Sequence, residues 1–358
     1  MSNYVELYKK YRPKTWRSLI GQKAVAENLR KSVVENTIPT AFGFFGPRGT
    51  GKTSSAFLLA KALNCLEPND GNPCNKCSVC INIDKNNQLG VSYVSMANNG
   101  SVDDVRQIVQ QARVAQPVKQ QVWILDEVHN LSKAAFDALL IPIEDKGMPS
   151  LFIFCSTEVD KIPATILSRI QQRKLSLVNS DDMFKFLNVV RKREEIDLTD
   201  EQLNSAVRAG RGSVRDTLSA LESIIHEGDS APSSSRELLE ALTTKSLEKI
   251  LEVSARANTN GENHRDLAEQ LFSDLRDLLL LSVKVDSSLV GVLPIDDPAT
   301  AIKELYGRTG ITVVMGEIGN ALKDISFGVD RRLHFEVAML NSVEKLKKVK
   351  KAIEARAK

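Results

Sequence analysis

Hydrophobic positions divide the chain into two halves of different character. In the first half, short apolar runs at residues 41–45, 91–96, 121–125 and 151–156 are separated by segments with helical periodicity. This alternation predicts βαβ units that build a parallel sheet. The runs are apolar along nearly their whole length, which is typical of strands that helices cover on both faces.

The second half has a helical pattern. After about residue 177 the strand pattern fades, and a Ser-rich, loop-like stretch follows at 227–235. Beyond it, apolar residues recur at three- and four-residue spacing, as at Leu271, Leu275 and Leu278. The predicted fold class is therefore an α/β domain followed by helical domains.

The composition indicates the general class of protein but does not indicate a ligand. A chain of 358 residues with 42% hydrophobic and 26% charged residues is typical of a globular protein with two or three domains. The net charge is only +3, so any contact with nucleic acid must come from local groups. The charged N-terminal segment and the short apolar runs predict a cytoplasmic protein without membrane contact.

Residues 46–53 fit the phosphate-loop pattern G-x-x-x-x-G-K-[ST], with an apolar strand before them and an apolar helical run after them. Glycines in such a loop let backbone N–H groups surround phosphates, and the following helix points its positive end at them. Lys52 is expected to reach the β- and γ-phosphates of ATP, and Thr53 to hold Mg²⁺. The predicted nucleotide-binding loop comprises Gly46, Pro47, Arg48, Gly49, Thr50, Gly51, Lys52 and Thr53.

Two carboxylates follow the third apolar run. Ligands bind at the carboxyl ends of strands in open α/β sheets, so we expect Asp126 to bind Mg²⁺ and Glu127 to act as general base on the attacking water. The alternative is an ordinary surface turn. Thr157, at the end of the fourth run, is a candidate polar contact to the γ-phosphate or its water, or an ordinary strand-end threonine.

Four cysteines have the spacing C-x8-C-x2-C-x2-C, namely Cys65, Cys74, Cys77 and Cys80. Four thiolates are a typical structural zinc site, and an iron–sulfur cluster is the chemical alternative. Because all four positions are protein ligands, we expect a structural role. Cys155 stands alone in an apolar run, where packing is the expected role.

Two arginines are further candidates. Arg169 ends a short helical run, and Arg215 lies inside a later helical segment. An arginine near the γ-phosphate stabilises developing charge and can act in trans. Taken from the pattern alone, either one equally fits a surface salt bridge.

Six motifs in this order resemble the gamma/tau subunits of bacterial DNA polymerase III clamp loaders, in the AAA+ superfamily. The resemblance is close over about residues 4–226 and looser beyond. The motifs lie at residues 11–22, 46–53, 64–80, 125–129, 163–169 and 212–216.

The resemblance implies roles for individual residues. Arg12, Pro13, Leu19 and Ile20 would line the adenine pocket. It also implies that Thr157 is sensor 1, that Arg215 is sensor 2 for the ATP of its own chain, and that Arg169 is an arginine finger inserted into the neighbouring subunit's site.

The resemblance also implies an architecture and a function. Residues 1–178 would form an AAA+ ATPase domain with a zinc module at 65–80, residues 179–242 a small helical lid, and residues 243–358 an all-helical collar. The chain would be an ATPase that opens a sliding clamp and loads it on primer–template DNA during replication. The expected partners are other clamp loader subunits in a hetero- or homo-oligomeric pentamer, the sliding clamp and DNA, and the expected cofactors are ATP, Mg²⁺ and Zn²⁺. The chain lacks the long tail of the tau form, so a gamma-like subunit is expected.

This chain departs from the family pattern in two places. Ile141 occupies a usual lysine position, and Pro142, inside a predicted helix, should kink or end it. Residues 98–101 are short of the basic residues found in relatives. Direct binding of DNA phosphates by this chain is therefore a weaker expectation than ATP hydrolysis.

Three rival hypotheses remain testable. A catalytically silent subunit would need a broken phosphate loop or missing acids, and both are intact. Another AAA+ motor, such as a branch-migration helicase, would unwind DNA without a clamp. A zinc-dependent nucleic-acid module would bind DNA regardless of ATP.

Overall fold

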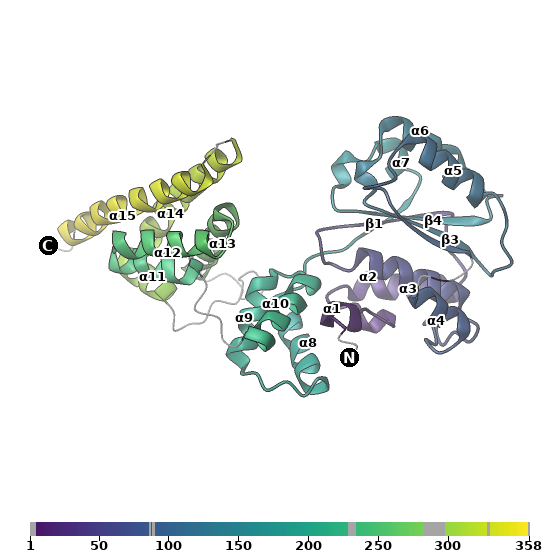
Figure 1. Cartoon of the computed structure of the whole chain (residues 1–358), viewed down its shortest axis with the longest axis horizontal. Coiled ribbons are helices and arrows are strands. Elements are labelled where there is room, and N and C mark those ends of the chain that lie inside the picture. The colour runs from purple at the N-terminus through teal and green to yellow at the C-terminus, as the bar shows by residue number, and fades with distance from the viewer. Residues whose placement is uncertain are drawn as a thin grey trace. The chain divides into compact units, whose positions relative to one another are not determined.

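The computed structural model describes residues 5–85, 87, 90–227, 234–282, 298–327 and 330–356. The chain forms two compact units, Met1–His226 and Glu227–Lys358, which are described separately below (Figure 1).

The first unit is built on a five-stranded parallel sheet of order β2-β3-β4-β1-β5. Its strands are β1 (Ala41–Phe45), β2 (Val91–Ser95), β3 (Gln121–Asp126), β4 (Ser150–Ser156) and β5 (Gln171–Lys174). Its helices up to β5 are α1 (Leu7–Lys10), η1 (Trp16–Ser18), α2 (Lys23–Val34), α3 (Lys52–Asn64), α4 (Ser78–Asp84), α5 (Val102–Ala112), η2 (Val128–Asn130), α6 (Lys133–Glu144), η3 (Val159–Lys161) and α7 (Ala164–Leu167).

Helices cover both faces of this sheet, as the apolar strands predict. Side chains alternate between faces along a strand, so Phe152 and Phe154 of β4 join one core while Ile153 joins the other. Figure 1 shows α5, α6 and α7 on one face and α2 and α3 on the opposite face. The predicted α/β class is confirmed.

The two edge strands differ from the buried centre. β2 is half-buried along most of its length, and β5, with the sequence Gln-Gln-Arg-Lys, is largely exposed. β5 pairs with β1 through Phe42↔Gln171 and the three following positions. The four apolar runs correspond to β1–β4 within one residue at each end, and β5 is the strand that the hydrophobic pattern missed.

Pro142 lies inside α6, two residues before the helix ends at Glu144. Because proline donates no backbone N–H and its ring crowds the preceding turn, it disfavours continuation of a helix, and α6 ends shortly after it, as expected. Ile141 is exposed on the same helix.

Three further helices complete the first unit: α8 (Ser180–Arg193), α9 (Asp200–Gly210) and α10 (Val214–Glu227). Asn179 and Thr199 cap α8 and α9 by accepting backbone N–H hydrogen bonds with their side chains. The segment Leu7–Lys10 is tied to these helices, because Lys10 Nζ lies 2.5 Å from Glu194 Oε2. Tyr11 donates its hydroxyl hydrogen to the same carboxylate, with 2.6 Å between Tyr11 Oη and Glu194 Oε1.

The second unit is helical throughout its described residues. It contains α11 (Ser234–Thr244), α12 (Leu247–Thr259), α13 (His264–Ser282), α14 (Pro298–Phe327) and α15 (Arg331–Arg356). Leu238, Leu271, Val314 and Phe335 are among the residues of one shared core. The backbone at Gly307 is not helical, with φ at 59° and ψ at −162°, so α14 is kinked there.

The boundary between the compact units, at residues 226 and 227, coincides with neither predicted boundary, 178 or 242. Residues of α11 such as Leu238 and Leu242 belong to the core of the second unit. The division into ATPase, lid and collar domains stays a prediction.

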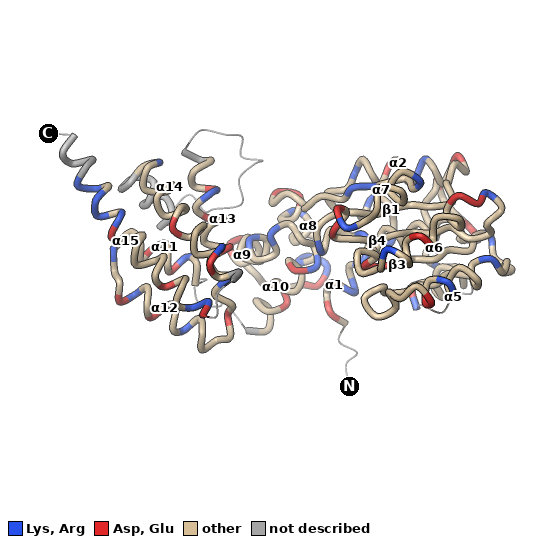
Figure 2. The backbone as a smooth tube through the Cα atoms, turned by 90° about the horizontal axis from the view of Figure 1, so that it is seen from above, with Lys and Arg blue, Asp and Glu red and all other residues tan. Residues whose placement is uncertain are grey.

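Basic and acidic residues are interspersed along most of the described chain, and α15 carries a basic run of Lys345, Lys347, Lys348, Lys350 and Lys351. Figure 2 shows basic and acidic positions interspersed in both units, in keeping with the net charge of +3. Within the described residues, none of the helices combines the length and the apolar character that crossing a membrane requires.

Candidate functional site

The phosphate loop connects β1 to α3, and its glycines are sterically required. A Cβ on Gly46, whose φ is +149°, would lie 2.1 Å from the carbonyl oxygen of Leu175. One on Gly49, at φ +73°, would lie 1.8 Å from the Ser213 hydroxyl oxygen. Only glycine allows this backbone path, and the path leaves the N-terminus of α3 facing a cavity.

Lys52 is almost fully buried at the start of α3. Its ammonium donates to the carbonyl oxygens of Gly46 and Pro47, at 2.8 and 2.7 Å. Burial lowers the pKa of Lys52, and the nearby Asp126 and Glu127 carboxylates act in the opposite direction. The cation is thus held at the base of the loop.

Asp126 and Glu127 follow β3 at its carboxyl end. The Thr53 hydroxyl donates to Asp126, with 2.8 Å between Oγ1 and Oδ2, across two elements that are distant in sequence. Glu127 is exposed and has a φ of +55°, which is uncommon for a residue with a side chain. Asp126 and Glu127 both line the same cavity.

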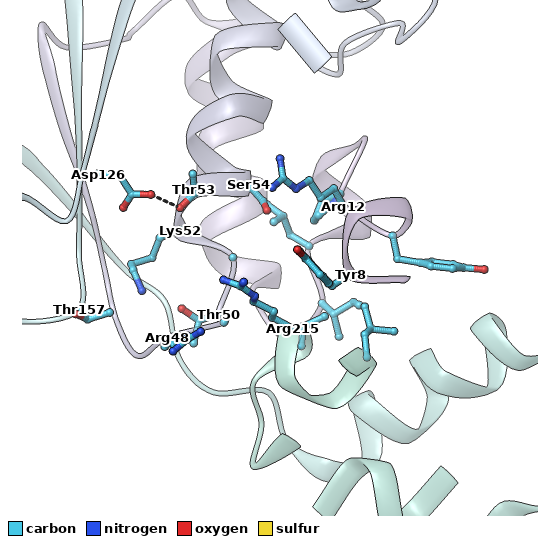
Figure 3. Close-up of a pocket in the computed structure, with 18 of the residues that line it drawn as sticks. Tyr8, Arg12, Arg48, Thr50, Lys52, Thr53, Ser54, Asp126, Thr157 and Arg215 are labelled. Carbon is cyan, nitrogen blue, oxygen red and sulfur yellow. Dashed lines mark hydrogen bonds between the residues drawn. The ribbon is translucent and has the colours of Figure 1, made fainter. Parts of the chain in front are cut away.

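These residues line a cavity of about 620 Å³. Figure 3 shows Lys52, Thr53, Asp126 and Thr157 towards one side of it, and Tyr8 and Arg12 towards the other. Of the predicted site residues, the cavity is lined by Arg12, Pro13, Leu19, Ile20, Arg48, Gly49, Thr50, Gly51, Lys52, Thr53, Asp126, Glu127, Thr157 and Arg215. Gly46 and Pro47 are not among the described lining residues.

Arg215, in the first turn of α10, reaches this cavity from the helical part of the first unit. Its guanidinium carbon lies 4.9 Å from the centroid of the Tyr8 ring, a cation–π contact. The start of α10 also touches the loop directly, because the Val214 N–H donates to the Gly49 carbonyl at 3.2 Å. The phosphate loop and α10 therefore form one continuous site.

Arg169 lies elsewhere and is not among the described residues that line the cavity. Its side chain pairs with Glu144 and donates to the Thr165 carbonyl at 2.8 Å. In this arrangement Arg169 does not contribute to the described lining of its own chain's cavity.

Several cavity residues were missed by reasoning from the sequence. Tyr8, Tyr11 and Ser54 line the cavity, yet no spacing rule marks them. His129 also lines it, and its Nδ1 lies 3.1 Å from the Ser156 hydroxyl oxygen, which ties the end of β3 to the end of β4. The position of His129 three residues after Asp126 was the available signal.

The four clustered cysteines converge as their spacing predicts. Their Sγ atoms all lie within 4.8 Å of one another. Four thiolates around Zn²⁺ at about 2.3 Å would be about 3.8 Å apart, so the set fits a tetrahedral site. Backbone N–H groups of Cys74 and Cys77 donate to the Sγ atoms of Cys65 and Cys74, a contact that favours the thiolate. At Cys65 this is outweighed by burial, which raises the pKa of the thiol. Backbone hydrogen bonds, chiefly from Lys76, lower the pKa of Cys74 despite partial burial.

Cys155 is separate from this cluster and fully buried. It packs in the core beneath α3, and burial raises the pKa of its thiol. Its environment agrees with the packing role that was predicted.

A parallel sheet of this strand order, with a phosphate loop after β1 and an acidic pair after β3, defines a P-loop domain of the AAA+ class. A family model described as "DNA polymerase III, delta subunit" matches residues 21–179. The chain is 29% identical over 356 residues to the DNA polymerase III subunit tau of Bacillus subtilis, covering 94% of this chain and 63% of that protein.

Two further relatives agree. The DNA polymerase III subunit gamma of Buchnera aphidicola is 36% identical over 229 residues, covering 63% of each chain. The gamma/tau subunit of Mycobacterium bovis is 32% identical over 356 residues, covering 92% of this chain and 61% of that protein. The chain belongs to the family of DNA polymerase III gamma/tau subunits, in the AAA+ superfamily. It spans about three fifths of the length of these relatives.

Among solved structures, a variant of RuvB from Thermotoga maritima matches with a TM-score of 0.46 at 16% identity, covering 94% of this chain and 91% of that one.

Proposed function

We propose that this chain is an ATP-hydrolysing motor subunit of a clamp loader, which opens a sliding clamp and places it on primer–template DNA. The observation that carries the proposal is the single cavity that brings Lys52, Thr53, Asp126, Thr157 and Arg215 together. Family membership supplies the assembly in which such a site would act.

ATP would occupy the cavity with its phosphates over the loop and its base between the N-terminal segment and α10. Backbone N–H groups of the loop and the N-terminus of α3 present positive ends to the phosphates. Leu19 and Ile20 offer apolar surface for adenine, beside Arg12 and Pro13. Lys52 would exchange its carbonyl contacts for the β- and γ-phosphate oxygens.

The residues around Thr53 and Asp126 fit Mg²⁺. A hydroxyl and a carboxylate are hard oxygen donors of the kind that Mg²⁺ prefers, and here they are in contact at 2.8 Å. When bound, the ion neutralises charge on the β- and γ-phosphates. Thr53 would hold it directly and Asp126 through water.

Hydrolysis would then depend on groups around the γ-phosphate. Glu127, exposed at the carboxyl end of β3, would accept a proton from the attacking water. Thr157 would position that water or the γ-phosphate, and Arg215 would stabilise the charge that develops there.

Arg169 would serve the site of a neighbouring subunit. It lies outside its own cavity on an exposed part of the first unit, next to Glu144. Docking of this arginine on a neighbour's γ-phosphate would make assembly into a pentamer depend on bound ATP, and hydrolysis would release it. Contacts of the assembly with the clamp and with DNA follow from the same proposal, as does a cytoplasmic location.

The cysteine cluster would hold a structural Zn²⁺. All four of its positions are thiols, which leaves no open coordination site for water. A metal there would brace the segment between α3 and α4, because Cys65 ends the one and Cys80 lies within the other.

A clamp-transfer assay tests the proposal. The chain, assembled with its partner subunits, should move a labelled sliding clamp onto primed circular DNA only when ATP is present. The same assembly with Lys52→Ala should transfer none. Transfer that proceeds equally without ATP would contradict the motor role.

A further inference from the structure

Both carboxylate oxygens of Asp126 accept hydrogen bonds from the protein. Oδ1 accepts the backbone N–H of Glu127 at 2.9 Å. Oδ2 accepts two hydroxyl donors, Thr53 at 2.8 Å and the phenol of Tyr93 at 3.2 Å. The third donor comes from a residue to which no motif assigns a role.

The sheet places Tyr93 beside Asp126. In the parallel pairing of β2 with β3, Ser95 is opposite Asp126 and Tyr93 is opposite Ile124. Side chains two residues apart share a face, so Ile124 and Asp126 point to the same side of the sheet. Tyr93, paired with Ile124, lies on that side too, which is the face that α3 covers. There its ring packs on Phe57 of α3, with 5.7 Å between the ring centroids and 28° between the planes.

Tyr93 therefore approaches Asp126 from the edge of the sheet. It is not among the described residues that line the ATP cavity, whereas Asp126 and Thr53 are. The Tyr93 hydroxyl approaches Asp126 from outside the cavity, and the Thr53 hydroxyl approaches it from inside the cavity. A residue so placed acts on bound nucleotide only through Asp126.

We propose that Tyr93 is a positioning residue that fixes the orientation of the Asp126 carboxylate for Mg²⁺. This inference rests on the proposed function, in which Thr53 turns its hydroxyl oxygen to the metal. Oδ2 then loses one of its two donors, and the phenol of Tyr93 keeps that oxygen in place. Groups that orient a metal-binding carboxylate in this way typically change metal affinity or activity by 10–100-fold when removed.

A purely structural role for Tyr93 is the competing explanation, and two substitutions separate the two. Tyr93→Phe removes the hydroxyl and keeps the ring on Phe57, while Tyr93→Leu removes both. Ser150→Ala is the matched control, because it deletes a buried hydroxyl that donates to the Ala112 carbonyl at 2.7 Å, at the amino end of β4 in the same sheet.

The first readout is binding of a fluorescent ATP analogue titrated with Mg²⁺. We expect Tyr93→Phe to bind the analogue normally in EDTA but to need about 10-fold more Mg²⁺ for the metal-dependent gain. Tyr93→Leu should show the same shift and a lower unfolding midpoint, and Ser150→Ala should show no Mg²⁺ shift. An unchanged Mg²⁺ requirement in Tyr93→Phe would overturn the inference.

The second readout needs neither nucleotide nor metal. A double-mutant cycle of Tyr93→Phe with Asp126→Ala, followed by thermal unfolding in EDTA, measures the contact itself. The shift of the double variant should be smaller than the sum of the single shifts, and additive shifts would overturn the contact. If the wild-type chain neither binds nor hydrolyses ATP, the proposed function fails while this cycle still reports on the contact.

Discussion

Gly49 and Ser213 are in van der Waals contact across the boundary between the phosphate loop and α10. A Cβ on Gly49 would lie 1.8 Å from the Ser213 hydroxyl oxygen, and the Gly49 carbonyl accepts the N–H of Val214 at 3.2 Å. A change in the phosphate loop should therefore displace Ser213 and the start of α10, and Ser213 is only two residues before Arg215.

We expect Gly49→Ala to disrupt both nucleotide binding and the placement of α10. The added methyl clashes with Ser213, and the φ of +73° disfavours any residue with a Cβ. ATP affinity, measured by equilibrium binding, should fall by at least about 10-fold, and the unfolding midpoint should fall with it.

Gly261→Ala provides the control for backbone strain. Gly261 has nearly the same φ, +75°, but a Cβ there would meet nothing within 4 Å. This variant should lose about 1 kcal/mol of stability and keep its ATP affinity. Equal loss of ATP affinity in both variants would show that the contact with Ser213 is irrelevant.

Glu127→Gln should separate binding from hydrolysis. Glutamine keeps the shape of the side chain but removes the carboxylate that would accept the proton. We expect ATP binding within a few-fold of wild type and turnover lower by about 10²–10⁴-fold, measured as phosphate release under saturating ATP. Turnover near the wild-type rate would assign the general base to another residue.

Arg169→Ala should impair ATP hydrolysis only in the assembled complex, where the arginine of one chain would serve the ATP site of its neighbour. Because Arg169 is outside its own cavity, ATP binding by the isolated chain should be unchanged. Turnover in the assembled complex should fall by about 10³-fold or more. Arg106→Ala, which removes an exposed arginine paired with Asp103, serves as the control and should retain full turnover.

A mixing experiment tests the same residue in trans. Glu127→Gln chains still carry Arg169, and Arg169→Ala chains still carry the general base. Combining the two inactive variants in one assembly should restore part of the turnover, at interfaces where each supplies what the other lacks. A mixture as inactive as its components would argue against action in trans.

The cysteine cluster should carry one Zn²⁺ per chain, measured by mass spectrometry of the native protein. Cys77→Ser should lose the metal and lower the unfolding midpoint, because metal binding contributes folding free energy. Cys155→Ala should retain the metal, since Cys155 is not part of the cluster. A brown protein with visible absorbance and no zinc would instead indicate an iron–sulfur cluster.

Chelation should affect folding more than chemistry. ATP turnover per folded molecule should survive zinc removal, because the cluster is not among the described residues that line the cavity. An apo protein that stays fully folded but loses turnover would contradict a structural role for the metal.

The contact between the N-terminal segment and α8 should make stability depend on pH. Hydrogen bonds from Lys10 and then Tyr11 lower the pKa of Glu194. A carboxyl whose pKa is lower in the folded chain stabilises it above the pKa of the unfolded chain, about 4.5. That contribution is lost as the pH falls through the pKa of the folded state.

Glu194→Gln should therefore lower the unfolding midpoint at pH 7 and have little effect near pH 3. Glu195→Gln, a change at the exposed neighbour, should have little effect at either pH. A Glu194→Gln shift of equal size at both pH values would show that the charge of Glu194 is not responsible.

The buried strands could be predicted from the sequence because buried positions carry apolar side chains. Strands β1, β3 and β4 are apolar at almost every position, so their bounds were predictable within a residue. β5 was not, because an edge strand such as Gln171–Lys174 needs no apolar side chains to pair with β1. The division of the compact units at residues 226 and 227 coincides with the start of the loop-like stretch at 227–235, although the predicted domain boundaries were placed at 178 and 242.

The candidate site was predictable where chemistry fixes spacing. Gly46 to Thr53 and the four clustered cysteines are local motifs, so their positions follow from the chain itself. Tyr8 and Tyr93 reach the site through tertiary contacts, with Arg215 and Asp126 respectively. Such contacts depend on strand register and helix placement, which no local pattern specifies.

The most direct test of the central claim is steady-state ATP hydrolysis by this chain assembled with its partner subunits. The rate should rise strongly only when the cognate clamp and primed DNA are both present, and it should vanish with Lys52→Ala. An intact basal rate that ignores clamp and primed DNA would contradict the clamp loader function and leave a different AAA+ motor.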